Sequence, residues 1–259
     1  KKDNLANVSR KGINYSLDLS EGIDLSVFLF SGFQKHLFNK KLRINNNESI
    51  LDVGANCGVV SLNYAKKYPS SVVYSFEPTD FAFSKMLTNI NLNKEHIKNI
   101  IPVKAFISSV DKDVSNLNIY SSWKVDNILG KNVHPTHRGS IKPASDVPTY
   151  KIDTFVNEHN IKKVGFIKID TDGFELDVLN GAAETIVRDR PIIVFEVGLY
   201  LLDEKDISFE SFIHYFADKK YKLFSTDLKK QITLNNYKST IPQEYTIDVF
   251  ALPDEYPLL

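Results

Sequence analysis

The stretch SILDVGANCGVV, residues 49–60, decides the fold of this chain. Residues 50–53 are apolar except for Asp52, which is typical of a buried strand in a parallel sheet. A tight turn with Gly54 and Gly58 follows, and a helix is expected to begin directly after it. Such a strand, turn and helix are the usual place for a nucleotide-like ligand, because the helix N-terminus offers unpaired N–H groups. We therefore expect an α/β fold with a ligand at this turn.

The spacing of the glycines distinguishes between ligands. A dinucleotide site needs G-x-G-x-x-G, but Asn56 stands at the middle glycine position and the turn reads G-x-x-x-G. A pyrophosphate packed on the turn would meet the Asn56 side chain. The form D-x-G-x-x-x-G, from Asp52 to Gly58, resembles the first motif of class I S-adenosylmethionine-dependent methyltransferases, in which the turn wraps the methionine part of the cofactor. An ordinary strand, turn and helix without a ligand is the alternative.

Composition narrows the class of protein. A chain of 259 residues can form one sizeable α/β domain, which we place at residues 49–259, after a lead-in or lid segment at residues 1–48. Lys and Arg equal Asp and Glu in number, at 32 each, so we expect neither a nucleic-acid partner nor an anionic lipid surface. The single cysteine, Cys57, suits a reducing compartment and a cytoplasmic location. No apolar run reaches the roughly 20 residues of a membrane helix, so membrane insertion is not expected.

The next two strands supply candidates for the nucleoside. Residues 71–76 read as a strand that ends at Glu77, one strand–helix–strand step beyond Asp52. At that distance an acidic residue meets ribose hydroxyls, and a carboxylate can accept from two of them. Residues 100–107 read as a third strand, whose Phe106 lies against adenine or packs in the core. A solvated glutamate at a strand end is the alternative for Glu77.

Outside these strands, periodicity predicts the remaining elements. Residues 15–19 alternate between apolar and polar side chains, as in a strand. In residues 24–38 the apolar side chains recur at helical spacing, so we expect helices that either pack on the sheet edge or form a lid. The helix after Thr79 should bury the i, i+3, i+4, i+7 set of Phe83, Met86, Leu87 and Ile90.

Residues 110–149 interrupt the alternation of strands and helices. Residues 114–120 could form an antiparallel arm, and the polar remainder reads as a long loop suited to substrate recognition. It contains His134, His137 and Arg138. The two histidines could bind a metal, but Pro135 between them opposes a regular helix, so solvated or substrate-contacting side chains are the alternatives.

A second informative stretch is VGFIKIDTDGFE, residues 164–175. Its strand delivers Asp170, Asp172 and Glu175 within six positions, and like charges crowded at a strand end are costly without a cation or strong donors nearby. The strand at residues 191–197 adds Glu196 near its own carboxyl end. These acids are therefore candidates for chemistry.

The two stretches together resemble the FkbM-type methyltransferase family. The matching pieces are LDVGANCG at 51–58, FEP at 76–78, KIDTDGFELDVLNGA at 168–182 and IVFEV at 193–197. The resemblance implies a Rossmann-like, seven-stranded, mostly parallel sheet with an antiparallel last strand and helices on both faces. It also implies methyl transfer from S-adenosylmethionine, usually to a hydroxyl of a sugar, a glycan or a secondary metabolite. The family more often has Glu where Asp172 stands.

By this resemblance, with Ala55 and Phe106 added from the turn and the third strand, the cofactor-binding residues are Asp52, Gly54, Ala55, Asn56, Gly58, Glu77, Phe106 and Asp170. Transfer to a hydroxyl needs a group that removes its proton. No histidine is tied by motif to the cleft, so the catalytic candidates are Asp170, Asp172 and Glu196. The same three carboxylates are the candidate ligands if Mg²⁺ lowers the hydroxyl pKa instead.

Two other classes of protein compete with this interpretation. A nicotinamide-dependent oxidoreductase would use the same sheet and ribose acid, and Asn56 argues against it. A non-catalytic module would bind the cofactor or a glycan without turnover. A nucleic-acid methyltransferase is disfavoured by the neutral charge and by Asp170-Thr171-Asp172-Gly173 in place of a [DN]-P-P-[YF] motif.

Overall fold

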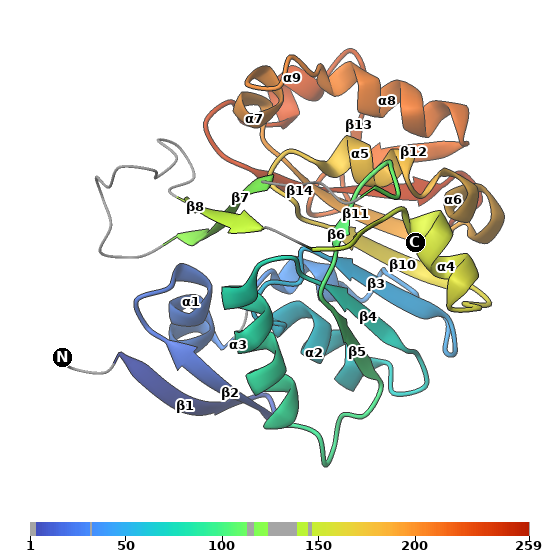
Figure 1. The fold of residues 1–259 in the computed structure, drawn as a ribbon. Coiled ribbons are helices and arrows are strands. Elements are labelled where there is room, and N and C mark those ends of the chain that lie inside the picture. Colours follow the sequence, from blue (N-terminus) through green and yellow to red (C-terminus); the bar gives the residue numbers. More distant parts are fainter. Residues whose placement is uncertain (1–3, 32, 113–116, 124–138, 145–146, 259) are drawn as a thin grey trace.

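A central sheet of eight strands organises the molecule (Figure 1). The computed structural model describes residues 4–31, 33–112, 117–123, 139–144 and 147–258. From one edge to the other, the strands are β13 (Gln231–Ile232), β12 (Tyr221–Phe224), β14 (Ile247–Pro253), β11 (Ile192–Val197), β10 (Val164–Ile169), β3 (Ser49–Val53), β4 (Val73–Phe76) and β5 (Ile100–Val103). The mostly parallel sheet expected from the sequence is confirmed, and the short β13 brings the count to eight instead of seven.

The strand order reverses between β3 and β10. From β3 the chain winds outward through α2 (Val59–Lys67), β4, α3 (Asp80–Asn91) and β5, and it then returns to place β10 and β11 on the other side of β3. The strands β5, β4, β3, β10 and β11 are parallel, and β14 is antiparallel to both of its neighbours. In open α/β sheets, ligands bind outside the carboxyl ends of the strands at such a reversal.

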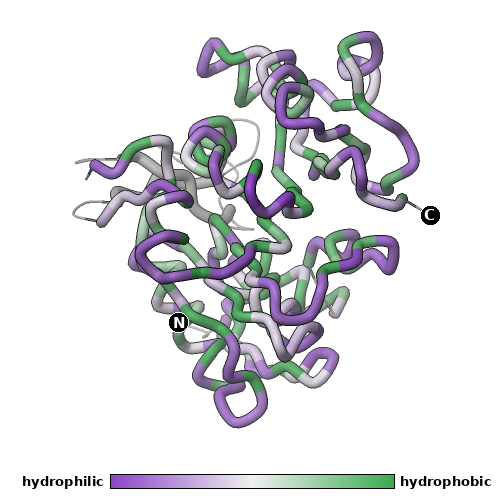
Figure 2. The backbone as a smooth tube through the Cα atoms, turned by 90° about the vertical axis from the view of Figure 1, so that its right-hand side faces the viewer, coloured by the Kyte–Doolittle hydropathy of each residue, from purple (hydrophilic) through white to green (hydrophobic). Residues whose placement is uncertain are grey.

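Each face of the sheet is covered by its own apolar core. Alternate residues of the strands, such as Ile50, Phe166 and Phe250, pack with α2 and the N-terminal segment. The opposite residues, such as Phe195, pack with α4 (Ile152–Glu158), α5 (Glu175–Asn180), α6 (Ala183–Asp189) and α8 (Phe209–Asp218). In Figure 2 the outer loops are largely hydrophilic, whereas the hydrophobic stretches run through the interior. None of the described helices has the length and the apolar character needed to cross a bilayer.

The N-terminal segment forms an antiparallel hairpin, β1 (Leu5–Arg10) and β2 (Ile13–Asp18), followed by α1 (Gly22–Phe30) and the 3₁₀ helix η1 (Lys35–Phe38). The strand predicted from residues 15–19 is thereby confirmed. The hairpin docks through two asparagines, one on α3 and one just after it. Asn89 Oδ1 accepts from Ser16 N at 2.9 Å, and Asn93 Oδ1 accepts from Asn14 N at 2.8 Å.

This docking corrects the expected core face of α3. Met86 is fully buried, but Leu87 is 41% exposed and Asn89 takes a buried position instead. Periodicity identifies a helix face, but here a polar residue is buried because the backbone of β2 needs a hydrogen-bond partner there.

The insertion before β10 contains two small sheets. The expected strand at residues 100–107 is split, since β6 (Phe106–Ile107) leaves the main sheet and pairs with β9 (Thr149–Tyr150). The expected arm is present as β7 (Leu117–Trp123), antiparallel to β8 (Gly139–Ala144). The short helices α7 (Leu199–Asp203) and α9 (Tyr237–Thr240) complete the fold.

Candidate active site

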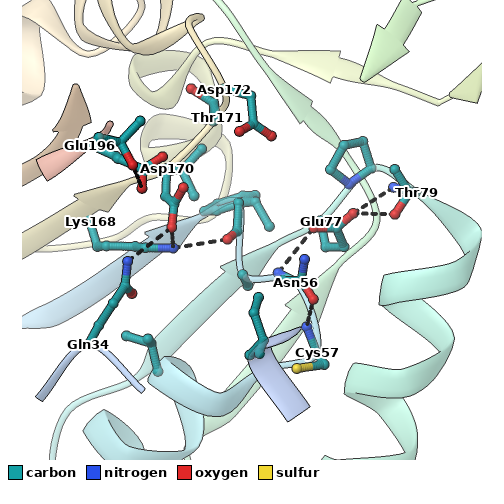
Figure 3. A pocket seen from close by; sticks show the side chains of 18 of the residues that line it. Gln34, Asn56, Cys57, Glu77, Thr79, Lys168, Asp170, Thr171, Asp172 and Glu196 are labelled. Carbon is teal, nitrogen blue, oxygen red and sulfur yellow. Dashed lines mark hydrogen bonds and ion pairs between the residues drawn. The ribbon is translucent and has the colours of Figure 1, made fainter. Parts of the chain in front are cut away.

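A cavity of about 340 Å³ lies at the carboxyl ends of β3, β4, β10 and β11, where the strand order reverses (Figure 3). We call residues 54–57 together with Glu77 the turn wall. We call Asp170, Asp172 and Glu196 the acid wall. The structure therefore brings both informative stretches of the sequence to one cavity. Of the residues proposed from the sequence, those that line it are Gly54, Ala55, Asn56, Glu77, Phe106, Asp170, Asp172 and Glu196.

The glycines of the turn have different structural roles. Gly54 has a φ of +75°, and a Cβ at this position would lie 1.8 Å from the backbone oxygen of Asp170. Gly58 has a φ of +80° and caps α2, where a Cβ would lie 2.9 Å from Met86 Cγ. Gly58 therefore packs against α3 and does not line the cavity.

Glu77 is tied to the turn through both of its oxygens. Its Oε2 accepts from Asn56 N at 3.1 Å, and its Oε1 accepts from Thr79 N and Oγ1 at 2.9 and 2.6 Å. Burial raises the pKa of this carboxyl above its ordinary value. A carboxylate can accept about four hydrogen bonds, and three are already made, so one position remains for a ligand hydroxyl. To accept from two ligand hydroxyls, Glu77 would have to lose one of these hydrogen bonds.

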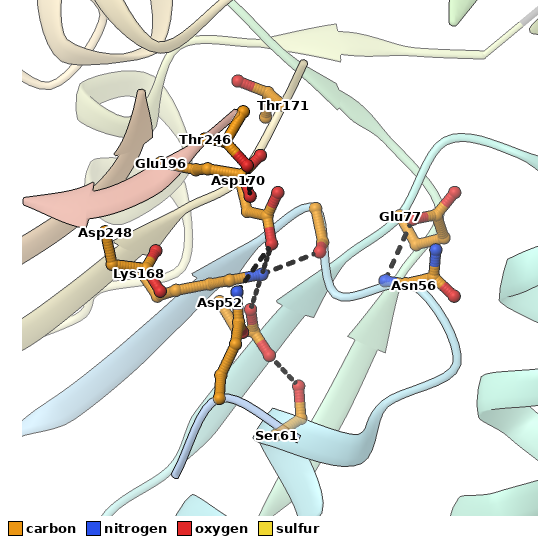
Figure 4. Close-up of polar contacts among 12 residues, drawn as sticks. Asp52, Asn56, Ser61, Glu77, Lys168, Asp170, Thr171, Glu196, Thr246 and Asp248 are labelled. Atoms are coloured by element: carbon orange, nitrogen blue, oxygen red, sulfur yellow. Dashed lines mark hydrogen bonds and ion pairs between the residues drawn. The ribbon is translucent and has the colours of Figure 1, made fainter. Parts of the chain in front are cut away.

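Beneath the cavity lies a buried lysine that the sequence analysis did not single out (Figure 4). Lys168 Nζ lies 3.0 Å from Gly54 O, 3.1 Å from Asp170 Oδ2 and 3.3 Å from Asp52 Oδ1. Burial opposes its charge, but Asp170 and Asp52 together raise the pKa of Lys168 above its ordinary value. The ammonium therefore donates a hydrogen bond to the glycine turn and forms ion pairs with two carboxylates.

Asp52 supports the site from behind and does not line the cavity. Its side chain is fully buried, and it accepts from Ser61 Oγ at 2.5 Å in addition to its ion pair with Lys168. The expectation of direct cofactor contact is thus replaced by a role in holding Lys168. Lys168 on β10 lies directly opposite Asp52 on β3, so the two side chains share one face of the sheet. The pair depends on this cross-strand register, which no local sequence pattern signals.

The acid wall brings three carboxyl groups together, and of these Asp170 forms an ion pair with Lys168. Glu196 Oε1 accepts from Thr246 Oγ1 at 2.8 Å. Burial and the charge of Asp170 raise the pKa of Asp172 and of Glu196 well above their ordinary values. Such carboxyls take up a proton readily and also favour a cationic ligand.

Glu175, which the sequence placed in the same acidic cluster, has a structural role. Its Oε1 accepts from Thr171 N and Oγ1, both at 3.0 Å, and from Gly173 N at 3.1 Å. These bonds close the turn between β10 and α5. The side chain is buried and is not part of the cavity lining.

Segments far away in the sequence complete the walls. Gln34, between α1 and η1, donates from Nε2 to Asp170 Oδ2 at 3.2 Å, and the neighbouring His36 pairs with the buried Asp248. Tyr200 and residues 244–246 line the acid side. Of residues 24–38, for which packing on the sheet edge or a lid was expected, Phe33 and Gln34 line the cavity. Ile23, just before this range, lines it as well.

Metal binding finds no support in the described part of the chain. There, no group of three or more His, Cys, Asp or Glu side chains has an arrangement that could hold an ion. The set of Asp170, Asp172 and Glu196 therefore does not fit the Mg²⁺ site considered from the sequence. His134, His137 and Arg138 lie outside the described residues.

Comparisons with known proteins agree on one type of domain. A family model described as the methyltransferase FkbM domain matches residues 52–223. "Methyltransferase 1" of Beauveria bassiana is 26% identical over 153 residues, which are 51% of this chain and 57% of that protein. "Hexuronic acid methyltransferase AglP" of Haloferax volcanii is 24% identical over 163 residues, which are 62% of this chain and 60% of that protein. The chain thus spans less than two thirds of the length of both relatives.

A solved structure shares the fold. The crystal structure of methyltransferase FkbM from Methylobacillus flagellatus superposes with a TM-score of 0.51 at 14% sequence identity, covering 85% of this chain and 48% of that one. This likeness supports the architecture described above.

Proposed function

Because the chain belongs to the FkbM methyltransferase family, we propose that it transfers a methyl group from S-adenosylmethionine to a hydroxyl oxygen of a sugar, a glycan or a secondary metabolite. The observation that carries this proposal is the cavity itself, with a glycine turn and a ribose-type acid on one side and the three carboxyls of the acid wall on the other. The relative from Haloferax volcanii, named a hexuronic acid methyltransferase, supports a sugar as acceptor.

The residues of the cavity fit this cofactor. At Gly54 the absence of a Cβ lets the turn approach the backbone of Asp170, which brings the turn wall and the acid wall to one cavity. Glu77 retains one acceptor position for a ribose hydroxyl. Phe106 packs edge-to-face on Phe174, at 5.4 Å between ring centroids, and offers an apolar surface for a base. The acid wall favours a ligand with positive charge, and S-adenosylmethionine carries a sulfonium and an ammonium group.

The contacts of the three catalytic candidates support different roles for them. Bound S-adenosylmethionine would supply an electrophilic methyl group, so the protein must align the acceptor oxygen and remove its proton. Asp170 is held by Lys168 and Gln34, which favours a positioning role. Glu196 and Asp172 remain as bases, because their raised pKa values bring proton uptake closer to neutral pH.

Isothermal calorimetry and methyl transfer test this proposal together. S-adenosylhomocysteine should bind, and Glu77→Gln should weaken its binding by about tenfold, as expected for one hydrogen bond to a charged acceptor. Glu196→Gln should bind the same ligand normally but should lose transfer of labelled methyl to hydroxylated acceptors. Glu255→Gln, at a largely exposed ion pair with Arg190, is the matched control and should change neither.

Two results would contradict the proposal. The absence of heat with S-adenosylhomocysteine would exclude the cofactor. Binding without product from any sugar or hydroxylated metabolite would favour the non-catalytic module considered from the sequence. The nicotinamide-dependent alternative is disfavoured by the family assignment.

A further inference from the structure

An accessible aromatic ring lies at the acid side of the cavity. Tyr245 lines the cavity and is 62% exposed, whereas the other hydrophobic side chains of the described lining are buried or half-buried. A ring in this position offers a flat apolar surface to a molecule that enters the cavity. Packing of the core does not account for Tyr245, so we consider it as a contact for a ligand.

The chain places Tyr245 beside the proposed base. It directly precedes Thr246, whose Oγ1 donates to Glu196 Oε1 at 2.8 Å. In Figure 4, Thr246 and Glu196 lie together, and Glu77 lies on the opposite side of the site. Under the proposed function the turn wall with Glu77 holds the nucleoside, so the surface next to Glu196 is left for the acceptor. Tyr245 therefore belongs to the acceptor side.

A second tyrosine approaches the same base. Tyr200, in α7, follows the strand that carries Glu196, and it also lines the cavity. Its ring lies against Gly198, where a Cβ would lie 2.8 Å from Tyr200 Cε1 and 2.9 Å from Thr246 Cγ2. Because Gly198 has no side chain, the ring of Tyr200 can lie close to Thr246. Two tyrosines thus lie near the hydrogen bond that holds Glu196.

Two tyrosines beside a carboxylate suit a sugar ring. The C–H groups on the flat side of a pyranose carry partial positive charge and pack on the negative face of an aromatic ring. The hydroxyls at the edge of the same pyranose can donate to a carboxylate. Tyr245 and Tyr200 can therefore hold the apolar side of a sugar while one of its hydroxyls reaches Glu196.

The charges of the lining favour an uncharged sugar. The described lining residues on the acid side include Asp172, Glu196 and Glu244. Lys168 is the one Lys or Arg among the lining residues that the structure describes, and it already contacts Gly54 O and two carboxylates. A sugar that carries a carboxylate or a phosphate would be repelled by the acids, because like charges at an interface are costly.

We propose that Tyr245 and Tyr200 hold the C–H face of an uncharged pyranose and direct one of its hydroxyls to Glu196. This inference rests on the proposed function and deepens it, because it names the acceptor class and the residues that select it. The relative from Haloferax volcanii is named for a hexuronic acid, which carries a carboxylate. We therefore expect this chain to differ from that relative in the charge of its acceptor.

Binding of simple glycosides tests the acceptor class without turnover. The probes are the methyl pyranosides of glucose, galactose and mannose and the corresponding methyl uronosides, added to the protein saturated with S-adenosylhomocysteine. Saturation-transfer NMR measures their affinities. At least one neutral glycoside should bind, with the strongest transfer to the C–H protons of one ring face. Its uronoside should bind at least about tenfold more weakly, because like charges then meet.

Variants connect this binding to the tyrosines. Tyr245→Ala should weaken binding of the neutral glycoside by about tenfold, because the stacking surface is lost, and should leave the affinity for S-adenosylhomocysteine unchanged by calorimetry. Tyr200→Ala should show the same selective loss. Tyr245→Phe keeps the aromatic face and should restore glycoside binding. Leu234→Ala, at a side chain that is 48% exposed and outside the cavity lining, is the control. Circular dichroism and Tm establish that each variant is folded.

The other outcomes overturn the inference. Unchanged glycoside affinity in Tyr245→Ala would remove this residue from the acceptor site, and a loss that extends to S-adenosylhomocysteine would assign it to the cofactor. Equal affinity for uronosides would refute the selection by charge, and a failure of all neutral pyranosides to bind would refute the acceptor class. Each of these results leaves the proposed methyl transfer to a hydroxyl intact. If S-adenosylhomocysteine does not bind, the proposed function fails and the inference fails with it.

Discussion

At the scale of single residues, Lys168 connects the protein groups that lie beneath the cavity. Its ammonium joins Asp52 on β3, Asp170 after β10 and the backbone of the glycine turn. The lysine and Asp52 are both buried, so neither charge can be compensated by water. Removing one partner of such a group leaves an uncompensated charge in the interior.

We expect Lys168→Met to destabilise the protein by about 3–5 kcal/mol, because Asp52 is then buried without its cation. Urea denaturation followed by circular dichroism measures the change. The double variant Lys168→Met/Asp52→Asn removes both charges and should recover part of the loss. If the single and the double variant are equally unstable, charge compensation is not the role of Lys168.

Glu196 provides a prediction about pH. A carboxyl with a raised pKa is protonated below that pKa and acts as a base only above it, so methyl transfer should rise with pH through the raised value. The acidic limb of the kcat profile should therefore lie above the ordinary glutamate pKa of about 4.3. Glu196→Gln should abolish the limb and lower kcat by about 10²–10⁴-fold.

The same variant separates activity from stability. Burial disfavours the ionised form of Glu196, so a neutral glutamine should not lower Tm at neutral pH. Asp172→Asn is the matched comparison, since its carboxyl has a raised pKa for the same reasons. If only Asp172→Asn removes the limb, Asp172 is the base and the assignment to Glu196 is wrong.

At the scale of elements, the glycine turn between β3 and α2 depends on one close backbone approach. We expect Gly54→Ala to lose S-adenosylhomocysteine binding and to be less stable than Gly12→Ala. Both positions have positive φ, which costs an alanine about 1–2 kcal/mol. At Gly54 the added Cβ also meets the backbone of Asp170, whereas at Gly12 it meets the flexible end of Lys66. Equal Tm values for the two variants would contradict this argument.

Elements and side chains that follow from a local sequence pattern could be predicted, whereas contacts between distant parts of the chain could not. β10 forms from the first, mostly apolar half of the stretch 164–175, as expected. Glu77 and Asp170 reach the cavity because each directly follows a strand. The pairing of Lys168 with Asp52 depends on cross-strand register, which a single sequence does not display. Gln34 reaches Asp170 across 136 residues, and no local pattern encodes that contact.

At the scale of the whole molecule, the N-terminal hairpin is joined to the sheet domain through α3. Asn89 is fully buried, accepts from Ser16 N of β2 and donates to Cys57 O of the turn at 2.9 Å. Its amide thus links the hairpin, the helix and the turn wall, so the segment before β3 shares the stability of the domain.

We expect Asn89→Ala to destabilise the protein by about 1–3 kcal/mol, because two backbone groups lose their partner in a buried position. Limited proteolysis should then cut near β1 and β2 faster than in the unmodified protein. Asn91→Ala on the exposed side of the same helix is the control and should stay within about 0.5 kcal/mol. Unchanged proteolysis of Asn89→Ala would show that the hairpin is held by its apolar contacts alone.

Residues from distant parts of the chain form the walls of the cavity, so the cavity is completed late during synthesis on the ribosome. The hydrogen-bond donor to Glu196 is Thr246, in the segment that leads into β14. The partner of His36 is Asp248, within β14 itself. A nascent chain that has emerged as far as β11 carries the glycine turn and the acids but not these partners. The cavity lining is complete only after residues 244–246 have left the exit tunnel, so cofactor present during translation meets the whole cavity only in the final stage of synthesis.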